Sequence, residues 1–309
     1  MQKRLAFTMI ELIFVIVIMG IVGKFGFEFL AQAYSTYIHQ QVNHTLQTNG
    51  AMAVEQIAKR LEYRIKDSVI ARETKITDAI PIAQIDTTKT YTVLEWLAID
   101  NEGFRGITKP YWSGILDLNK SNATTLYSPD TNTSKINTLI QTLSNNHSNI
   151  SNAALYFIGS NVNVRKDFGW AGTEHNQTRI NQQLAAIHPI TAVTTGVESE
   201  KKFISSTGVD FTGIDLYEYY QLTWTAYAIV MEDYNASSQK GNLVLYWDYQ
   251  PWEGEKIANA THSATLMENI STFQFTSIGS IIKIQVCTNS DLLKDEGEEY
   301  SLCKEKTIY

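Results

Sequence analysis

A single carboxylate, Glu11, stands inside an almost continuously apolar stretch near the start of this 309-residue chain. The stretch runs from Phe7 to Gly23, and two basic residues, Lys3 and Arg4, precede it. A charge inside a membrane-spanning segment costs about 2.5–3.5 kcal/mol, so such a residue usually marks a functional contact. Glu11 is therefore the first candidate functional residue, as a polar group held within a bilayer.

The rest of the chain offers little catalytic chemistry. The six histidines show neither HxH nor HExxH spacing, so no helix-borne zinc site is indicated. The nucleophile elbow GxSxG, the Walker loop and the dinucleotide fingerprint GxGxxG are all missing from the sequence. A Ser-His-Asp arrangement could arise only from residues far apart in the chain. We therefore expect a protein that is not an enzyme and that needs no cofactor or metal.

The two cysteines, Cys287 and Cys303, lie close together near the C-terminus. A cysteine-based metal site is not expected, because the chain has no CxxC motif and no histidine beside either cysteine. An acidic cluster follows Cys287, and we interpret this cluster as solvated charge, with Ca²⁺ binding as the alternative. Its members are Asp291, Asp295, Glu296, Glu298 and Glu299.

An aromatic-rich run invites comparison with surfaces on which sugars or bases stack. Aromatic side chains are ordinary in strands and cores, so we interpret the run as packing. The net charge of −7 also argues against broad binding to nucleic acid, which needs basic surface. The run comprises Tyr217, Tyr219, Tyr220, Trp224 and Tyr227, with Trp247 and Trp252 further on.

A long helix must position Glu11. Apolar residues recur every three to four positions from Leu30 to Val69, which places them on one face of a helix. Asn49-Gly50 predicts a kink or short break, and the helix is expected to end near Ala71–Lys75, before Pro81. No proline precedes Pro81, so a proline kink is excluded.

The residues Ala6-Phe7-Thr8-Met9-Ile10-Glu11-Leu12 resemble the processing and N-methylation site of type IV prepilins and type II secretion pseudopilins. In that family a prepilin peptidase cuts after a small residue, normally glycine, and methylates the new N-terminal phenylalanine. Here the cut would fall between Ala6 and Phe7. Gly20, nine residues after Glu11, also fits the family pattern, and the motif covers about residues 3–23.

The resemblance implies a domain order and a location. Residues 1–6 would be a leader, 7–30 a transmembrane and filament-core helix, 31–75 an amphipathic spine helix, and 76–309 a β-rich periplasmic head. The chain would cross the bacterial inner membrane once, with its N-terminus in the cytoplasm. In the oxidising compartment beyond that membrane, Cys287 and Cys303 are expected to form a disulfide, with two free thiols as the alternative.

Alternation of apolar and polar residues replaces the helical spacing from about residue 76. We therefore expect an α+β fold, in which the long helix packs on a mainly antiparallel sheet. A polar segment near 117–153 reads as a surface insertion carrying a short helix at Ile136–Leu143, and a second short helix is expected at Ile180–Ile187. The predicted strands are Tyr91–Ile99, Tyr111–Leu116, Leu155–Ile158, Tyr217–Glu232, Asn242–Tyr249, Ile281–Cys287 and Cys303–Ile308.

The functional prediction is a minor pilin or pseudopilin, because a head of this size would hinder the stacking of a major subunit. The C-terminal strands resemble those of the larger J-class minor pseudopilins. The family precedent pairs Glu11 with the Phe7 amine of a neighbouring subunit, and implies a prepilin peptidase, other pilins and an inner-membrane assembly platform as partners. The alternatives are a pilus-tip binding subunit, for adhesion or DNA uptake, and an unrelated single-pass anchored protein.

Overall fold

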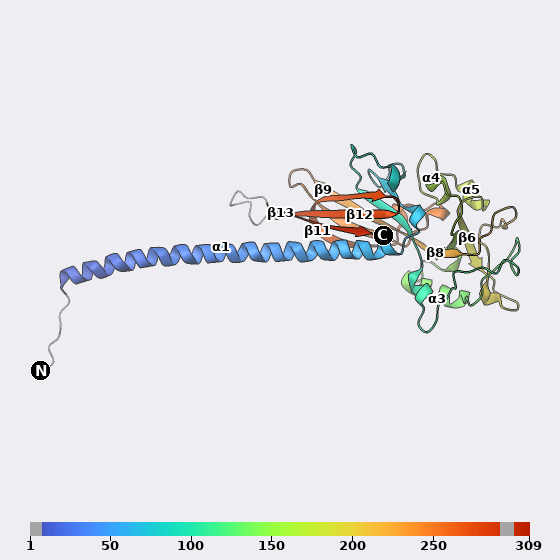
Figure 1. Cartoon of the computed structure of the whole chain (residues 1–309), viewed down its shortest axis with the longest axis horizontal. Coiled ribbons are helices and arrows are strands. Elements are labelled where there is room, and N and C mark those ends of the chain that lie inside the picture. The colour runs from blue at the N-terminus through green and yellow to red at the C-terminus, as the bar shows by residue number, and fades with distance from the viewer. Residues whose placement is uncertain (1–7, 291–299) are drawn as a thin grey trace.

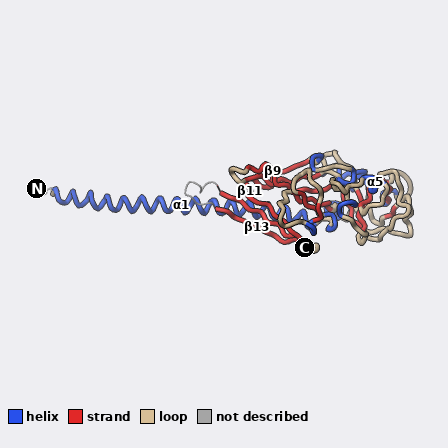
Figure 2. The backbone as a smooth tube through the Cα atoms, turned by 90° about the horizontal axis from the view of Figure 1, so that it is seen from above, coloured by secondary structure: helices blue, strands red, loops and turns tan. Residues whose placement is uncertain are grey.

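The helix α1 (Met9–Glu62) extends far beyond the rest of the chain. A computed structural model describes residues 8–290 and 300–309 of the protein. At 1.5 Å per residue its 54 residues span about 80 Å. Figure 1 and Figure 2 show from two directions that the N-terminal half projects alone, whereas the C-terminal half lies along a β-sheet. The mixed α+β class is confirmed.

The sheet beside α1, which we call the proximal sheet, has eight antiparallel strands in the order β13-β12-β11-β10-β9-β3-β1-β2. The strands β9 and β10 form the hairpin expected from the sequence, with Leu245 opposite Ile229. The strands are β1 (Ile70–Arg72), β2 (Ile80–Pro81), β3 (Val93–Ala98), β9 (Thr225–Asn235), β10 (Lys240–Trp247), β11 (His262–Ile278), β12 (Ile281–Ser290) and β13 (Tyr300–Ile308).

A second sheet, with order β4-β7-β6-β5-β8, lies at the end of the molecule farthest from the N-terminus and forms a distal lobe (Figure 1). Short helices cover this lobe. The strands are β4 (Leu126–Tyr127), β5 (Ala154–Phe157), β6 (Ile187–Ala192), β7 (Lys202–Ser205) and β8 (Tyr220–Thr223). The α-helices are α2 (Asn101–Arg105), α3 (Thr133–Leu143), α4 (Val164–Asp167) and α5 (Gln177–Asn181). The 3₁₀ helices within residues 8–290 and 300–309 are η1 (Lys66–Ser68), η2 (Ile82–Gln84), η3 (Ile150–Asn152), η4 (Ser199–Lys201), η5 (Pro251–Glu253) and η6 (Ile257–Asn259).

The C-terminal part of α1 buries one face against the proximal sheet. Ala53, Ile57 and Leu61 are fully buried there, in a cluster that includes Phe273 of β11 and Ile284 of β12. The apolar spacing of this part of the helix therefore reports a true contact surface. That contact fixes the direction in which the free half of α1 leaves the head.

The predicted end of the helix at Ala71–Lys75 was wrong, because α1 ends at Glu62. The Ile65 N–H instead donates to the Leu97 carbonyl at 2.9 Å, which draws the chain into the sheet. Ile65 and Val69 are buried as the spacing predicted, but the backbone that carries them is no longer α-helical. The spacing of apolar residues at every fourth position therefore did not distinguish a continuing helix from the irregular segment that leads into β1.

The predicted break at Asn49-Gly50 was also wrong, since α1 runs unbroken through both residues. Gly50 is buried, and a Cβ placed there would lie 3.2 Å from Cγ of Lys304. The glycine allows β13 to pass close to the helix. Gly50 is therefore explained by close packing between the helix and β13 and not by a turn.

The long strand predicted at Tyr217–Glu232 is divided between the two sheets. Its first part forms β8 in the distal lobe and its second part forms β9 in the proximal sheet, with Trp224 between them. This crossing joins the two sheets directly. A continuous β pattern in the sequence carries no mark of the residue at which a chain changes sheets.

Three further predictions need correction. Tyr111–Leu116 forms no strand and contributes only an isolated bridge between Ile115 and Tyr219. The second short helix, α5, ends at Asn181, and Ile187 begins β6. The polar segment near 117–153 is more than a surface loop, because β4 and α3 bury apolar side chains in the core of the distal lobe. These side chains include Leu126, Ile136, Ile140 and Ile150.

Candidate functional site

Glu11 lies in the first turn of α1 and is exposed. Its Oε2 accepts from the Thr8 backbone N–H at 3.3 Å and from the Thr8 hydroxyl at 3.2 Å. Thr8 is the N-cap residue, so Glu11 satisfies one of the free amides at the start of the helix. Within the described residues Glu11 has no cationic partner, and its charge is therefore available to another molecule.

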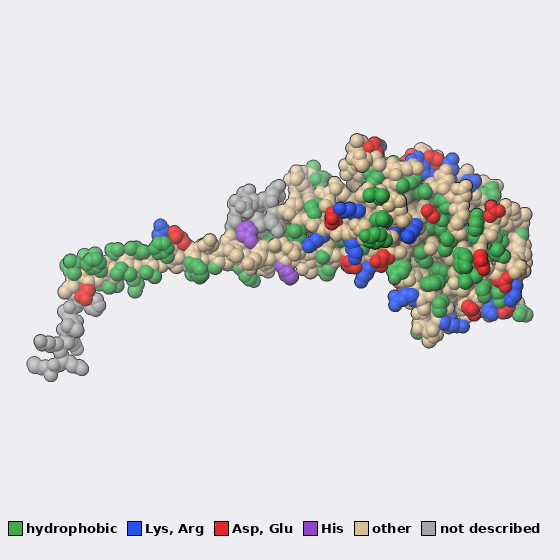
Figure 3. Space-filling view, viewed as in Figure 1, with side chains coloured by type: hydrophobic (Ala, Val, Ile, Leu, Met, Phe, Trp, Pro, Cys, Tyr) green, Lys and Arg blue, Asp and Glu red, His purple; other side chains and the backbone are tan. Residues whose placement is uncertain are grey.

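The surface around Glu11 is apolar and contacts no other described part of the chain. The apolar part of α1 is unburied in the described structure, and the helix is long and apolar enough to cross a membrane. Figure 3 shows the apolar side chains covering the projecting half of the helix, whereas charged side chains are scattered over the head. The exposed residues include Ile10, Ile13, Phe14, Val17, Ile18, Ile21 and Phe25.

Three glycines lie on this projecting half at a spacing of three. A Cβ added to Gly20, Gly23 or Gly26 would meet no atom within 4 Å. Packing within the described chain therefore does not require these glycines. They leave the helix backbone open to a close neighbour, as small residues do in membrane helix packing.

The two predicted processing residues, Ala6 and Phe7, lie outside the described residues. The acidic cluster between the cysteines, from Asp291 to Glu299, lies outside them too. The predicted disulfide is confirmed, because Cys287 and Cys303 are bonded at 2.10 Å. These two residues face each other directly in the β12–β13 pairing, so the disulfide joins neighbouring strands.

Polar contacts lock α1 onto the head just beyond the projecting half. Lys306 of β13 donates to the Glu55 carboxylate, and this hydrogen bond lowers the pKa of Glu55. At the end of the helix the buried Arg64 guanidinium donates to the carbonyls of Leu61 and Ser280. These contacts join the packed part of α1 and the residues just after it to β13 and to the turn between β11 and β12.

The sequence search missed a cluster around Asp248, which is fully buried just after β10. The Ser148 hydroxyl donates to Asp248 Oδ1 at 2.6 Å, and Nδ1 atoms of His147 and His262 lie 3.1 and 3.4 Å from Oδ2. The four residues come from three distant stretches of the chain, so no motif could have revealed them. The one unusual local feature of the cluster is the positive φ of Asp248, 62°, and this angle is visible only in the structure.

The Asp248 cluster resembles a catalytic triad in composition but not in arrangement. The Ser148 hydroxyl donates to Asp248 Oδ1 at 2.6 Å, the neighbouring His147 Nδ1 lies farther away at 3.4 Å, and Ser148 is buried, so a substrate could not reach its hydroxyl. A nucleophilic serine needs a histidine base within hydrogen-bond reach and access to substrate. The cluster instead joins the start of β11 and the end of β10 to the segment that follows α3.

The aromatic run is mainly a packing feature, as predicted. Tyr220, Trp224 and Trp252 are buried, and only Tyr219 is strongly exposed, at 55% of its surface. The described residues contain no group of three or more histidine, cysteine, aspartate or glutamate side chains arranged to hold a metal ion. The described structure presents an exposed apolar segment of α1 with Glu11 near its start, attached to a folded head.

Comparisons with protein families, with curated proteins and with solved structures found no match to this chain.

Proposed function

We propose that this protein is a minor pilin or pseudopilin, a non-enzymatic subunit that joins a filament through its N-terminal helix. One observation carries the proposal: the projecting half of α1 is apolar, unburied and marked by a single carboxylate near its start, while the other half is packed on a folded head. A charge inside a membrane-spanning segment costs about 2.5–3.5 kcal/mol, which favours a functional contact for Glu11 over simple anchoring. The motif from Ala6 to Leu12 supports the same proposal.

The proposed mechanism follows from the surroundings of Glu11. Among the described residues, Thr8 is the one partner of its carboxylate. Prepilin peptidase would remove residues 1–6 and expose the ammonium of Phe7, and the Phe7 ammonium of a neighbouring subunit would then pair with Glu11. Removing one member of a buried ion pair costs about 3–5 kcal/mol, so the pair would select one axial position along the filament.

The apolar residues and the open glycines of the projecting half would then pack against neighbouring helices in the filament core. The head would remain outside this core, on the periplasmic or extracellular side of the bacterial inner membrane. Its size suits a subunit that initiates or caps a filament. Other pilins or pseudopilins and an inner-membrane assembly platform would be the partners.

The test compares Glu11→Ala with Glu28→Ala in cells that assemble the filament. Glu28 lies on the same exposed helix, with Lys24 3.8 Å away, and serves as the matched control. Glu11→Ala should insert normally but lose incorporation by about 100-fold or more, since 3 kcal/mol corresponds to a factor above 100. Glu28→Ala should be incorporated like the wild type.

Normal incorporation of Glu11→Ala would contradict the assembly role. Mass spectrometry of the mature protein gives an independent measurement, with an N-methylated Phe7 as the expected first residue. An intact Met1 would remove the pilin proposal.

A further inference from the structure

The second half of β11 pairs on one edge only. β10 pairs with β11 as far as Ile270, and β12 pairs with it from Ile270 to Ile278. Asn269, with φ of 58°, and the adjacent register shifts mark the place where the strand changes neighbours. Among the described residues, Ser271–Ile278 therefore has β12 on one side and no strand on the other.

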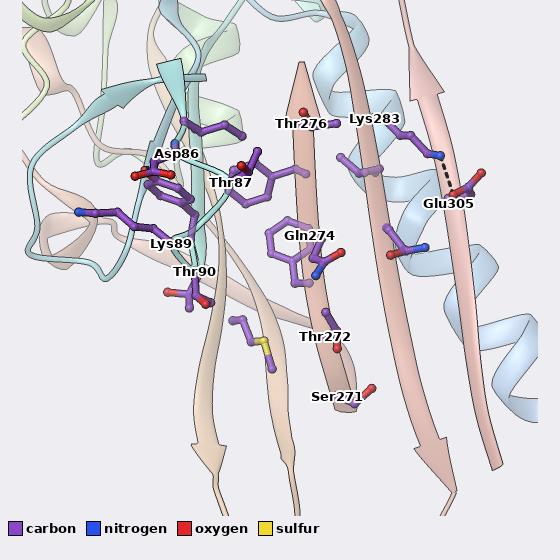
Figure 4. Close-up of a pocket in the computed structure, with 18 of the residues that line it drawn as sticks. Asp86, Thr87, Lys89, Thr90, Ser271, Thr272, Gln274, Thr276, Lys283 and Glu305 are labelled. Atoms are coloured by element: carbon purple, nitrogen blue, oxygen red, sulfur yellow. Dashed lines mark hydrogen bonds and ion pairs between the residues drawn. The ribbon is translucent and has the colours of Figure 1, made fainter. Parts of the chain in front are cut away.

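A groove of about 760 Å³ lies along this half of β11. Six consecutive residues, Ser271–Thr276, line it, together with Ile85–Thr87 and Lys89–Thr92 in the segment that follows η2. Residues of β9, β12 and β13 complete the lining: Met231, Tyr234, Lys283, Ile284, Gln285 and Glu305. Successive residues of a strand point to opposite faces, so a wall that contains all six presents the edge of the strand. Figure 4 shows β11 on one side of the groove and Asp86, Thr87, Lys89 and Thr90 across from it.

The backbone of this edge is available for pairing. In an antiparallel ladder every second residue directs its N–H and C=O away from its partner strand. No backbone hydrogen bond joins Ser271–Ile278 to the described residues across the groove. The Ser277 hydroxyl is also buried without a hydrogen-bond partner in the described part of the chain.

Natural edge strands are usually protected by lysine, proline or a very short length. The segment Ser271–Ile278 has no charged residue and no proline, and it is long enough to template another strand. An unprotected edge of this kind would promote aggregation unless it served a partner.

The side chains along the edge define the chemistry of that partner. Phe273 and Phe275 are buried on one face, whereas Gln274 and Thr276 are exposed on the other. An added strand would continue this alternation, with an apolar residue at every second position. The lysines beside the groove are already paired, Lys89 with Glu73 at 2.6 Å and Lys283 with Glu305 at 2.8 Å, which favours an uncharged segment.

We propose that this groove binds an extended, uncharged segment of another protein, which adds to the proximal sheet as a strand beside Ser271–Ile278. The main-chain ladder would supply affinity and the alternating side chains would supply selectivity. This binding site belongs to the head and does not depend on the role of Glu11.

The first experiment uses the full chain in detergent and a short capped peptide of alternating valine and threonine as the probe. Hydrogen exchange should slow at every second amide of Ser271–Ile278 when the peptide binds. Two N-methylated forms of the peptide, each blocked at alternate amides, distinguish strand addition from non-specific apolar binding. One form should bind like the parent, and the form blocked on the pairing side should bind at least about tenfold more weakly, because several hydrogen bonds are lost.

The second experiment fills the groove. Thr90 is exposed and lines the groove, whereas the exposed Thr88 belongs to the same loop but does not. Thr90→Trp should abolish binding of the peptide, and Thr88→Trp should leave binding within about twofold of the wild type, a difference under 0.5 kcal/mol. Equal binding of both N-methylated peptides, unchanged exchange at Ser271–Ile278 in millimolar peptide, or wild-type binding by Thr90→Trp would overturn the proposal.

Discussion

A buried ion pair joins β1 and β3 within the proximal sheet, and breaking this pair tests how the head is stabilised. The Arg72 Nε of β1 donates to Glu95 Oε1 of β3 at 2.5 Å, and the side chains are only 5% and 2% exposed. The Tyr249 hydroxyl donates to the other carboxylate oxygen at 2.9 Å. Arg72 also donates to the carbonyls of Thr77 and Ala171, at 2.5 and 2.6 Å.

The perturbation is Glu95→Gln, which keeps the shape of the side chain and removes its charge. The Arg72 guanidinium would then be a buried charge with only neutral partners. Removing one member of a buried pair costs about 3–5 kcal/mol. That cost is a large share of a typical free energy of unfolding of about 5–15 kcal/mol. For a head of this size it corresponds to a decrease in melting temperature of about 6–20 °C.

The assay is urea unfolding of the full chain in detergent, followed by tryptophan fluorescence. Trp96 and Trp170 are buried in the head and report on its unfolding. Glu174→Gln is the matched control, because its partner Arg165 lies at 2.9 Å but both side chains are more than a third exposed. The control should cost less than about 1 kcal/mol. A loss for Glu95→Gln no larger than that of the control would refute this reasoning.

Two further predictions concern stability. Burial lowers the pKa of His188 to about 4, so the folded state holds this imidazole neutral while the unfolded chain protonates it near pH 6.5. Stability should therefore be lost as the pH falls from 6.5 to 4, by about 3 kcal/mol in total. Burial raises the pKa of Asp100 to about 6, which has the opposite sign, adding stability as the pH falls from 6 towards 3.8. The measurement is thus the difference in urea stability between wild type and His188→Phe, which should change by about 3 kcal/mol between pH 7 and pH 4; a constant difference would contradict the assignment. Cys303→Ser opens the disulfide to Cys287, whose sequence separation is 16, and should lower the free energy of unfolding by about 3 kcal/mol. Reduction of the wild type should have the same effect, and no change in either case would show that the disulfide contributes nothing to stability.

Local patterns predicted those elements whose environment is uniform along their length. The hydropathy near Glu11 required a long apolar helix, and the alternation at Asn242–Tyr249 required a strand. The spacing of Ile136 and Ile140 correctly predicted α3. In each case one face of the element has the same environment along its whole length, so the residue pattern is sufficient to predict the type of secondary structure.

The predictions that were wrong lie where the chain changes its partner. Ile65 and Val69 continued the helical spacing of α1, yet a hydrogen bond to β3 ended the helix before them. Trp224 stands inside a continuous β pattern at the point where the chain crosses from one sheet to the other. These changes depend on residues distant in sequence, which no local window contains.

The sequence by itself determined the projecting apolar helix with Glu11 near its start and a β-rich head, because both follow from residue order and local hydropathy. The tertiary structure alone decided that the head has two sheets, that Asp248 gathers two histidines and a serine, and that Ser271–Ile278 presents an unpaired edge. A strand edge is free or occupied according to how far its neighbours extend, and β10 begins at Lys240, just after the β9–β10 turn, so its pairing with β11 reaches only Ile270. That placement results from long-range packing, so the groove beside β11 had no signature in the sequence.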